Sequence, residues 1–167
     1  MKLHNYYISL LLLIISLPAT AQHREAIPFA DFEHWVTRHL KESPILGGKE
    51  RTLYAIAPDT IIDGPIAYRN RGGSPWASSN AYANVVGIRK ASCTVIPEER
   101  ANGDLCARLD SKLEVVRVLG IVDIEVLISG SIYLGELYEP IRSVNNPYGK
   151  MTMGIPFTKR PKKLVFD

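Results

Sequence analysis

Short apolar segments separated by turn residues follow one another through the second half of this 167-residue chain. Each is rich in β-branched or aromatic residues, and they span residues 92–96, 104–109, 113–119, 121–134, 150–153 and 162–166. Several short strands at this spacing are typical of a β-sandwich or a jelly roll. The sequence therefore predicts a mainly β protein, a jelly-roll β-sandwich.

The longest of these segments, residues 121–134, alternates between two faces. One face carries Val122, Ile124, Val126 and Ile128, and the other carries Ile121, Asp123, Glu125 and Leu127. Asp123 and Glu125 therefore project to the same side about 7 Å apart, a separation that overlaps those of glycosidase carboxylates. Alternating acids also occur on half-exposed strands, so a catalytic pair and a solvated strand face both stay open.

The first half of the chain contains one pattern that is typical of a helix. Apolar residues recur there at steps of three and four, at Phe29, Phe32, Val36 and Leu40. The pattern predicts an N-terminal helix over residues 28–43, which Pro44 would end. A short strand over residues 31–35 is the competing interpretation. Further along, strands are expected at residues 52–57 and 83–88, with a long loop at 58–70.

Two sets of polar residues could be interpreted as metal ligands, and neither has the spacing of a metal site. His34 and His39 lie five residues apart, which on a helix places them on different faces. Asp59 and Asp63 offer oxygen ligands that calcium accepts, but their spacing matches no known calcium-binding loop. We therefore expect solvated acids here, and no metal or other cofactor.

Residues 71–84 gather aromatic, hydroxyl and amide side chains in one stretch. Pro75 and the preceding glycines break any helix, so Trp76 is expected where a loop enters a strand. A sugar binds with a C–H face on such a ring and with hydroxyls bonded at its edge. The candidate ligand-binding residues are Trp76, Asn80, Arg71 and Tyr68. The alternative is a Trp76 buried in the core beside ordinary turn residues.

The first 21 residues have the pattern of a secretory signal peptide. Lys2 precedes an apolar run that ends at Leu17, and residues 18–21 then supply small residues in an Ala-x-Ala pattern. A membrane anchor would need about 20 apolar residues, and this run is shorter. Cleavage is expected after Ala21, so the product is predicted to be periplasmic or secreted, with no membrane span in the mature chain.

The mature chain, residues 22–167, has a normal size for one domain. Removal of Lys2 with the signal peptide takes one positive charge from a formal net charge of +3. A balance so close to neutral is not the electrostatic footprint of a nucleic-acid-binding protein. We expect no nucleic-acid partner.

Cys93 and Cys106 are the only cysteines, and export would bring both into an oxidising compartment. The alternative is a pair of buried thiols. The Asn102-Gly103 dipeptide is a two-residue hairpin signal whose register would separate the two cysteines. Pro97 argues against that register, because a residue without an N–H would stand inside the ladder. A wider loop sets Cys93 opposite Cys106, and we predict a disulfide between them.

Six segments occur in order along the chain: DFEHW at 31–35, SPWASSN at 74–80, CARL at 106–109, VLGI at 118–121, GSIYLG at 130–135 and GIPFTKRP at 154–161. Together they resemble the putative carbohydrate metabolism domain (PCMD) of secreted Bacteroidetes proteins. The resemblance covers most of the mature chain and implies a jelly-roll sandwich similar to galactose-binding folds. The resemblance does not imply any catalytic residue in this chain. It also implies further strands after the last motif, so the domain is expected to be incomplete at Asp167.

The leading hypothesis is an exported carbohydrate-binding β-sandwich that recognises a glycan or oligosaccharide without catalysis. The second is a glycoside-active enzyme that uses Asp123 and Glu125. The third is a structural or adhesive cell-surface module with a protein partner. Release of reducing sugar separates an enzyme from a binding protein, and a glycan array separates a binding protein from a structural module.

Overall fold

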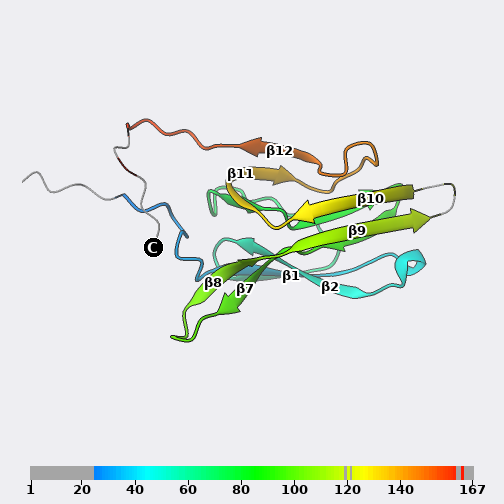
Figure 1. Ribbon diagram of the computed structural model, residues 1–167, viewed down its shortest axis with the longest axis horizontal. Coiled ribbons are helices and arrows are strands. Elements are labelled where there is room, and N and C mark those ends of the chain that lie inside the picture. Colours follow the sequence, from blue (N-terminus) through cyan, green and yellow to red (C-terminus); the bar gives the residue numbers. More distant parts are fainter. Residues whose placement is uncertain (1–24, 119, 121, 161–162, 164–167) are drawn as a thin grey trace, which may run out of the picture.

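The computed structural model describes residues 25–118, 120, 122–160 and 163. Within these residues the chain forms one short 3-10 helix, η1 (Pro44–Leu46), and strands β1 to β12 (Figure 1). The strands are β1 (Trp35–Lys41), β2 (Glu50–Ile56), β3 (Thr60–Asp63), β4 (Trp76–Ser78), β5 (Ala81–Val85), β6 (Ile88–Ser92), β7 (Val95–Glu99), β8 (Leu105–Leu109), β9 (Ser111–Val118), β10 (Val122–Ser129), β11 (Ile132–Tyr138) and β12 (Lys150–Met153). The predicted mainly β class is confirmed.

Two expectations concern residues beyond this description. The predicted signal peptide, residues 1–21, lies outside the described residues. Of the last predicted strand, residues 162–166, only Lys163 is described.

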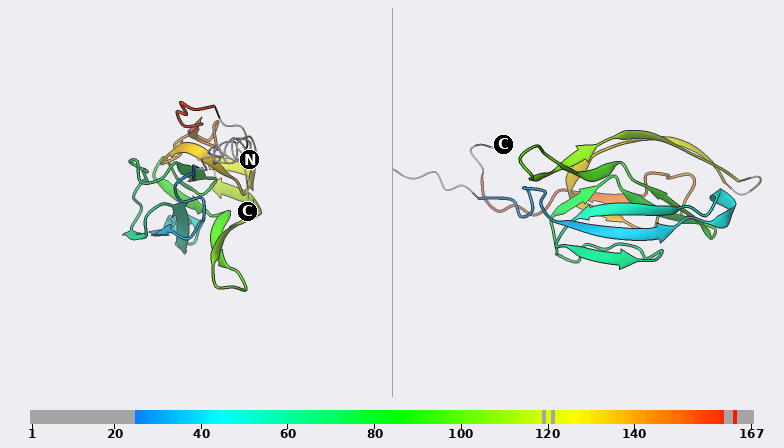
Figure 2. Two further views of the ribbon diagram at one scale, coloured as in Figure 1. Left: turned by 90° about the vertical axis from the view of Figure 1, so that its left-hand side faces the viewer. Right: turned by 90° about the horizontal axis from the view of Figure 1, so that it is seen from below.

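The strands form small sheets rather than two broad ones. One sheet has the order β2-β1-β3 and another the order β12-β11-β4, while β5–β6, β7–β8 and β9–β10 are two-stranded hairpins. All pairs are antiparallel except β1 with β3, which is parallel. The β7–β8 hairpin projects from the body of the molecule (Figure 2, left).

The β5–β6 hairpin packs through both of its faces. Tyr82 and Ala91 on one face join a buried cluster with Leu40 of β1 and Leu53 of β2. The opposite face contributes to a second buried cluster, formed by Val85, Ile88, Val116, Val118 and Val122. The β5–β6 hairpin therefore lies between the β1–β2 strands and the β9–β10 hairpin, which gives the sandwich its layers.

The predicted N-terminal helix is wrong, because residues 35–41 form strand β1. Val36, Arg38 and Leu40 all point into the core, a period of two that a buried strand requires. The period of two is not visible in the sequence, because Arg38 is charged and a charged residue is not expected at a buried position. The competing strand over residues 31–35 is also not formed before Trp35. Two hydrogen-bonded turns occupy residues 27–32, and residues 33 and 34 belong to no strand.

Most other predicted strands are found where the sequence placed them. The segment 92–96 is an exception, because it contains the end of β6 at Ser92, two residues outside any strand, and the start of β7 at Val95. Three further differences have local causes. The segment 121–134 is split at Gly130, where backbone atoms of Asp110 and Thr94 occupy the space that a β-carbon would need. The segment 83–88 is a hairpin, because Val86 and Gly87 both have positive φ and form the turn between β5 and β6. The predicted loop at 58–70 contains the short strand β3.

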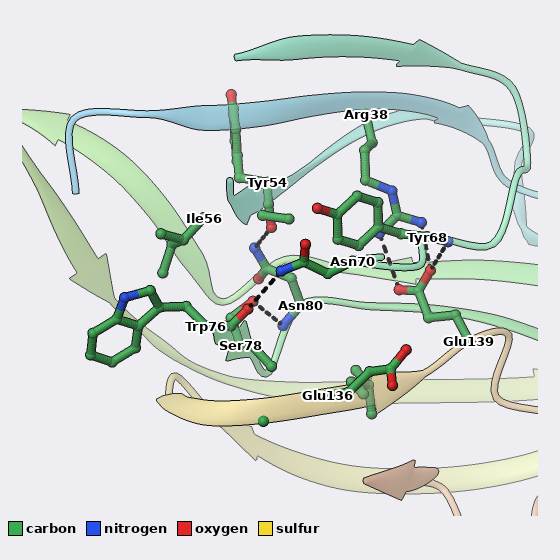
Figure 3. A pocket seen from close by; sticks show the side chains of 14 residues that line it. Arg38, Tyr54, Ile56, Tyr68, Asn70, Trp76, Ser78, Asn80, Glu136 and Glu139 are labelled. Atoms are coloured by element: carbon green, nitrogen blue, oxygen red, sulfur yellow. Dashed lines mark hydrogen bonds and ion pairs between the residues drawn. The ribbon is translucent and has the colours of Figure 1, made fainter. Parts of the chain in front are cut away.

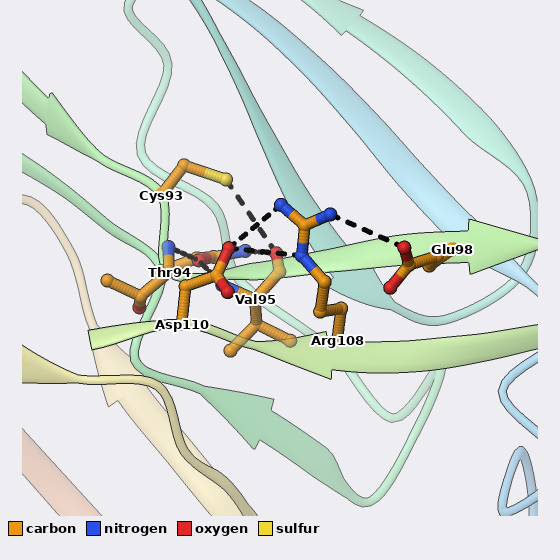
Figure 4. A network of polar contacts seen from close by, with 7 residues as sticks. Cys93, Thr94, Val95, Glu98, Arg108 and Asp110 are labelled. Atoms are coloured by element: carbon orange, nitrogen blue, oxygen red, sulfur yellow. Dashed lines mark hydrogen bonds and ion pairs between the residues drawn. The ribbon is translucent and has the colours of Figure 1, made fainter. Parts of the chain in front are cut away.

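The predicted disulfide is also wrong, since Cys93 and Cys106 are free thiols. Cys106 stands opposite Glu98 in the β7–β8 ladder, while Cys93 precedes β7 and directs its Sγ toward the carbonyl oxygen of Val95, 3.7 Å away (Figure 4). Arg108 of β8 contacts Glu98 across the same hairpin. In this register Cys93 and Cys106 are not opposite each other, so they cannot form a disulfide.

Turn geometry explains why the register differs from the predicted one. Gly103 has φ +89° and donates its N–H to the carbonyl oxygen of Arg100, and the Arg100 N–H bonds to Asp104. This is a three-residue hairpin loop with a glycine at the left-handed position. Ladder bonds alternate from the Arg100–Asp104 pair, so Pro97 falls opposite Ala107 at a non-bonded pair. Its missing N–H therefore removes no ladder bond.

Candidate functional site

A depression opens beside β2, β4 and β11 and the segment that follows β3 (Figure 3). Its lining includes three of the four predicted ligand-binding residues, Tyr68, Trp76 and Asn80, together with Asn70 and Glu136. Arg71, the fourth, is exposed and does not line it. The enclosed volume is about 40 Å³, enough for a few water molecules. A sugar would therefore lie across the mouth of the depression.

The floor of the depression is a buried ion pair. Arg38 of β1 donates from Nη1 to Glu139 Oε1 at 3.1 Å and from Nη2 to Oε2 at 2.6 Å. The same carboxylate accepts the backbone N–H groups of Tyr68 and Tyr82. Arg38 Nε is buried and bonds to no described atom. The ion pair therefore holds the site together from below and leaves one unmet donor at its floor.

Tyr68 is the best-placed of the predicted residues to bond a ligand. The guanidinium carbon of Arg38 lies 5.2 Å from its ring centroid, a cation–π contact that fixes the ring. Burial raises the pKa of the Tyr68 hydroxyl, an effect that Arg38 opposes and Glu139 adds to. The hydroxyl is therefore protonated at neutral pH. It bonds to no other residue in the described part of the chain, so it can donate to and accept from a ligand.

Trp76 lies at the start of β4, where the sequence predicted a loop entering a strand. Its Nε1 donates to the carbonyl oxygen of Pro28 at 2.8 Å, and the ring of Phe32 meets it edge-on with centroids 5.4 Å apart. Trp76 is partly buried and is one of the residues that line the depression. The N-terminal segment thus holds the ring, and Figure 3 shows the ring pointing away from Tyr68 and Glu136, so Trp76 lies at the edge of the depression.

Asn80 has a structural position at the depression. Its Nδ2 donates to the carbonyl oxygens of Tyr54 and Val95, at 2.8 and 2.6 Å. Its Oδ1 accepts from the backbone N–H groups of Thr94 and Val95, at 2.8 and 2.9 Å. These four bonds use the full capacity of the amide. Asn80 therefore ties β7 to β2 and has no bond to offer a ligand.

Glu136 is the functional candidate that the sequence analysis missed. It lies on β11 across the depression from Tyr68 and Trp76, and it is only partly buried (Figure 3). Among the described residues, none forms a hydrogen bond or an ion pair with its carboxylate. The available signal was a single acid within the otherwise uncharged strand of residues 132–138.

The candidate catalytic pair has a different environment. Asp123 and Glu125 lie on the exposed face of β10, and both contact Arg117 of β9, at 3.5 and 2.7 Å. Neither lines the depression. The arrangement is that of a cross-strand surface ion pair, which contributes little to stability.

The histidines and aspartates considered above as metal ligands do not form a common site. His34 Nδ1 lies 2.8 Å from Asp59 Oδ2, whereas His39 contacts Thr52. Asp63 is at the end of β3, opposite His39. In the described ranges there is no group of three His, Cys, Asp or Glu side chains that could hold a metal ion. Those ranges also contain no helix long and apolar enough to cross a membrane.

Comparison with known proteins gives one positive result. No curated protein and no solved structure matches the chain. Residues 31–165 match the sequence profile of a family described as "Putative carbohydrate metabolism domain". The match spans all of the described strands and both sides of the depression, and the chain belongs to this family.

Proposed function

We propose that the protein is an exported, non-catalytic carbohydrate-binding domain whose binding site is the depression between Tyr68, Trp76 and Glu136. Membership of a carbohydrate-related family supports a sugar as the ligand. The signal-peptide pattern at residues 1–21 supports export to the periplasm or the medium. The partner is a glycan or oligosaccharide that extends beyond the depression.

The observation that carries this proposal is the combination of free polar groups with an aromatic ring. The Tyr68 hydroxyl and the Glu136 carboxylate bond to no described residue, and both line the depression that Trp76 also lines. A carboxylate and a phenol can bond adjacent sugar hydroxyls, while the indole, at the edge of the depression, contacts the C–H face of a sugar ring that lies across its mouth. The small enclosed volume favours a ligand bound at the surface.

Glycan-array screening followed by calorimetry on the strongest hit tests the proposal. We expect Glu136→Gln and Tyr68→Phe each to weaken binding about tenfold, because each removes one hydrogen bond to the ligand. Glu125→Gln is the matched control, since Glu125 is an acid on an exposed strand outside the depression. Its affinity should equal that of the wild type.

Two results would contradict this assignment. An array without any binding glycan would argue against carbohydrate recognition. Binding that survives Glu136→Gln and Tyr68→Phe unchanged would place the sugar elsewhere on the molecule. Export is tested separately by mass spectrometry of the secreted or periplasmic product, whose N-terminus should be Gln22.

A further inference from the structure

A second cavity lies between the β5–β6 and β9–β10 hairpins, away from the carbohydrate site. Its volume is about 70 Å³, larger than that of the depression described above. Its walls come from inward-facing positions of the four strands and from the segment after β11, at Ile141, Ser143 and Pro147. This cavity shares no lining residue with the depression.

One end of the cavity is entirely apolar. Val85 and Ile88 stand opposite each other at the turn of the β5–β6 hairpin, and they pack against Val116 and Val122 of the facing hairpin. All four side chains are buried. This end therefore offers a surface for hydrocarbon and no group to bond a polar ligand atom.

Charged groups gather along the β6–β9 side of the same cavity. Lys90 of β6 and Glu114 of β9 both line it, and Lys90 Nζ lies 3.4 Å from Glu114 Oε2. Lys90 also contacts the buried Glu42 at 3.0 Å. Lys112 Nζ contacts Glu114 Oε1 at 2.7 Å, and Arg51 Nε lies 3.4 Å from Glu42 Oε2.

This cluster has an excess of positive charge. Three cations, Lys90, Lys112 and Arg51, surround the two carboxylates, Glu42 and Glu114, which leaves a net charge of +1. The Lys90 ammonium has three N–H donors and two carboxylate contacts. One donor therefore remains for a ligand, and a single negative charge would balance the cluster.

We propose that this cavity binds a linear alkyl carboxylate. The chain lies toward Val85, Ile88 and Val122, and the carboxylate accepts a hydrogen bond from Lys90. Charge complementarity identifies the head group, because an anion balances the surplus cation whereas an ammonium would add to it. The apolar end identifies the tail.

Calorimetry on the purified protein with octanoate, octanol and octylammonium tests this proposal. We expect octanoate to bind most tightly, octanol more weakly and octylammonium not at all. Replacing octanoate by hexanoate should weaken binding by about fourfold for each methylene removed from the buried part of the chain. All ligands are used below their aggregation concentrations.

Variants locate the site. Ala83→Leu places a larger side chain on the cavity wall and should abolish octanoate binding. Val115→Leu is its control, because Val115 is on the outer face of β9 and does not line the cavity. Lys112→Met removes the surplus charge while Lys90 stays in place. It should weaken octanoate several-fold and leave octanol unchanged.

Three outcomes would overturn the proposal. The first is no octanoate binding by protein that melts cooperatively. The second is octanoate affinity that survives Ala83→Leu when the variant melts like the wild type. The third is octylammonium affinity equal to that of octanoate, which would reject the head-group assignment. None of these results bears on the carbohydrate site, whose residues are unchanged in all variants.

Discussion

Arg38 on β1 and Glu139 after β11 form a buried, two-point ion pair although they are 101 positions apart in sequence. The Glu139 carboxylate also accepts N–H groups from Tyr68 and Tyr82, and Arg38 donates to the carbonyl oxygen of Ile66. One ion pair thus connects β1, β5, β11 and the segment that carries Tyr68. It is the structural support of the candidate carbohydrate site.

Breaking this pair should destabilise the protein strongly. We expect Arg38→Met to lower the free energy of unfolding by about 3–5 kcal/mol, because it leaves the Glu139 carboxylate buried without its charge partner. Urea unfolding measures the effect. Arg117→Met is the matched control. It breaks the exposed pairs with Asp123 and Glu125 and should cost less than about 1 kcal/mol.

The double variant Arg38→Met/Glu139→Leu separates the ion pair from simple packing. It removes both charges, so we expect it to be more stable than Arg38→Met. Equal urea midpoints for Arg38→Met and Arg117→Met would contradict a supporting role for the buried pair.

Trp76 should contribute to both stability and binding. Its ring packs against Phe32 and its Nε1 bonds to Pro28, so Trp76→Ala should cost about 2 kcal/mol, less than the 3–5 kcal/mol of a fully buried ring. The same variant should lose glycan affinity. Thermal melts beside a binding assay measure the two effects. A loss of stability with unchanged glycan affinity would show that Trp76 does not contact the glycan.

The two cysteines should remain thiols in the purified protein. Burial raises the pKa of the Cys93 thiol, and it outweighs the hydrogen bond to Val95 and the charge of Lys112. Cys93 should therefore react slowly with iodoacetamide in the folded state, because the thiolate is the reactive form. Unfolding without reductant should make both residues react. A Cys93–Cys106 bridged peptide in a non-reducing digest would contradict the observed register.

Glu114 should make stability dependent on acid pH. Burial acts to raise the pKa of Glu114, but the hydrogen bond from Lys112 and the charge of Lys90 outweigh it and hold the pKa below its ordinary value. The ionised form is therefore favoured by folding. Its stabilisation is complete above the unfolded pKa of about 4.3 and is lost as pH falls through the folded value.

Urea unfolding at a series of pH values checks this. The free energy of unfolding of the wild type should fall below about pH 4. Glu114→Gln should be less stable at neutral pH, and its stability should fall less on acidification. Glu125→Gln, at an exposed position, is the control. If the free energy of unfolding of Glu114→Gln depends on pH in the same way as that of the wild type, protonation of Glu114 does not cause the loss of stability in acid.

Local patterns predicted much of the fold. Runs of β-branched and aromatic residues between turn signals located β2, β8, β9, β10 and β12. In β9 and β10 buried and exposed side chains also alternate, which is the period of two of a half-buried strand. The same alternation correctly placed Asp123 and Glu125 on an exposed face. Pro75 and its glycines placed Trp76 at a strand entrance, since those residues constrain the backbone wherever they occur.

Contacts between distant residues decided the rest. Arg38 can occupy a core position only because Glu139 meets it there, and without that partner in view its strand resembled a helix. The Asn80 amide forms all of its hydrogen bonds to backbone groups of β2, β7 and Thr94. The Glu136 carboxylate has no partner among the described residues. No local sequence pattern indicates either arrangement. The cysteines were separated by the left-handed Gly103, which sets the register of a whole hairpin. Sequence periodicity reports which face of a strand is buried, whereas partners and register depend on what the rest of the chain brings to that face.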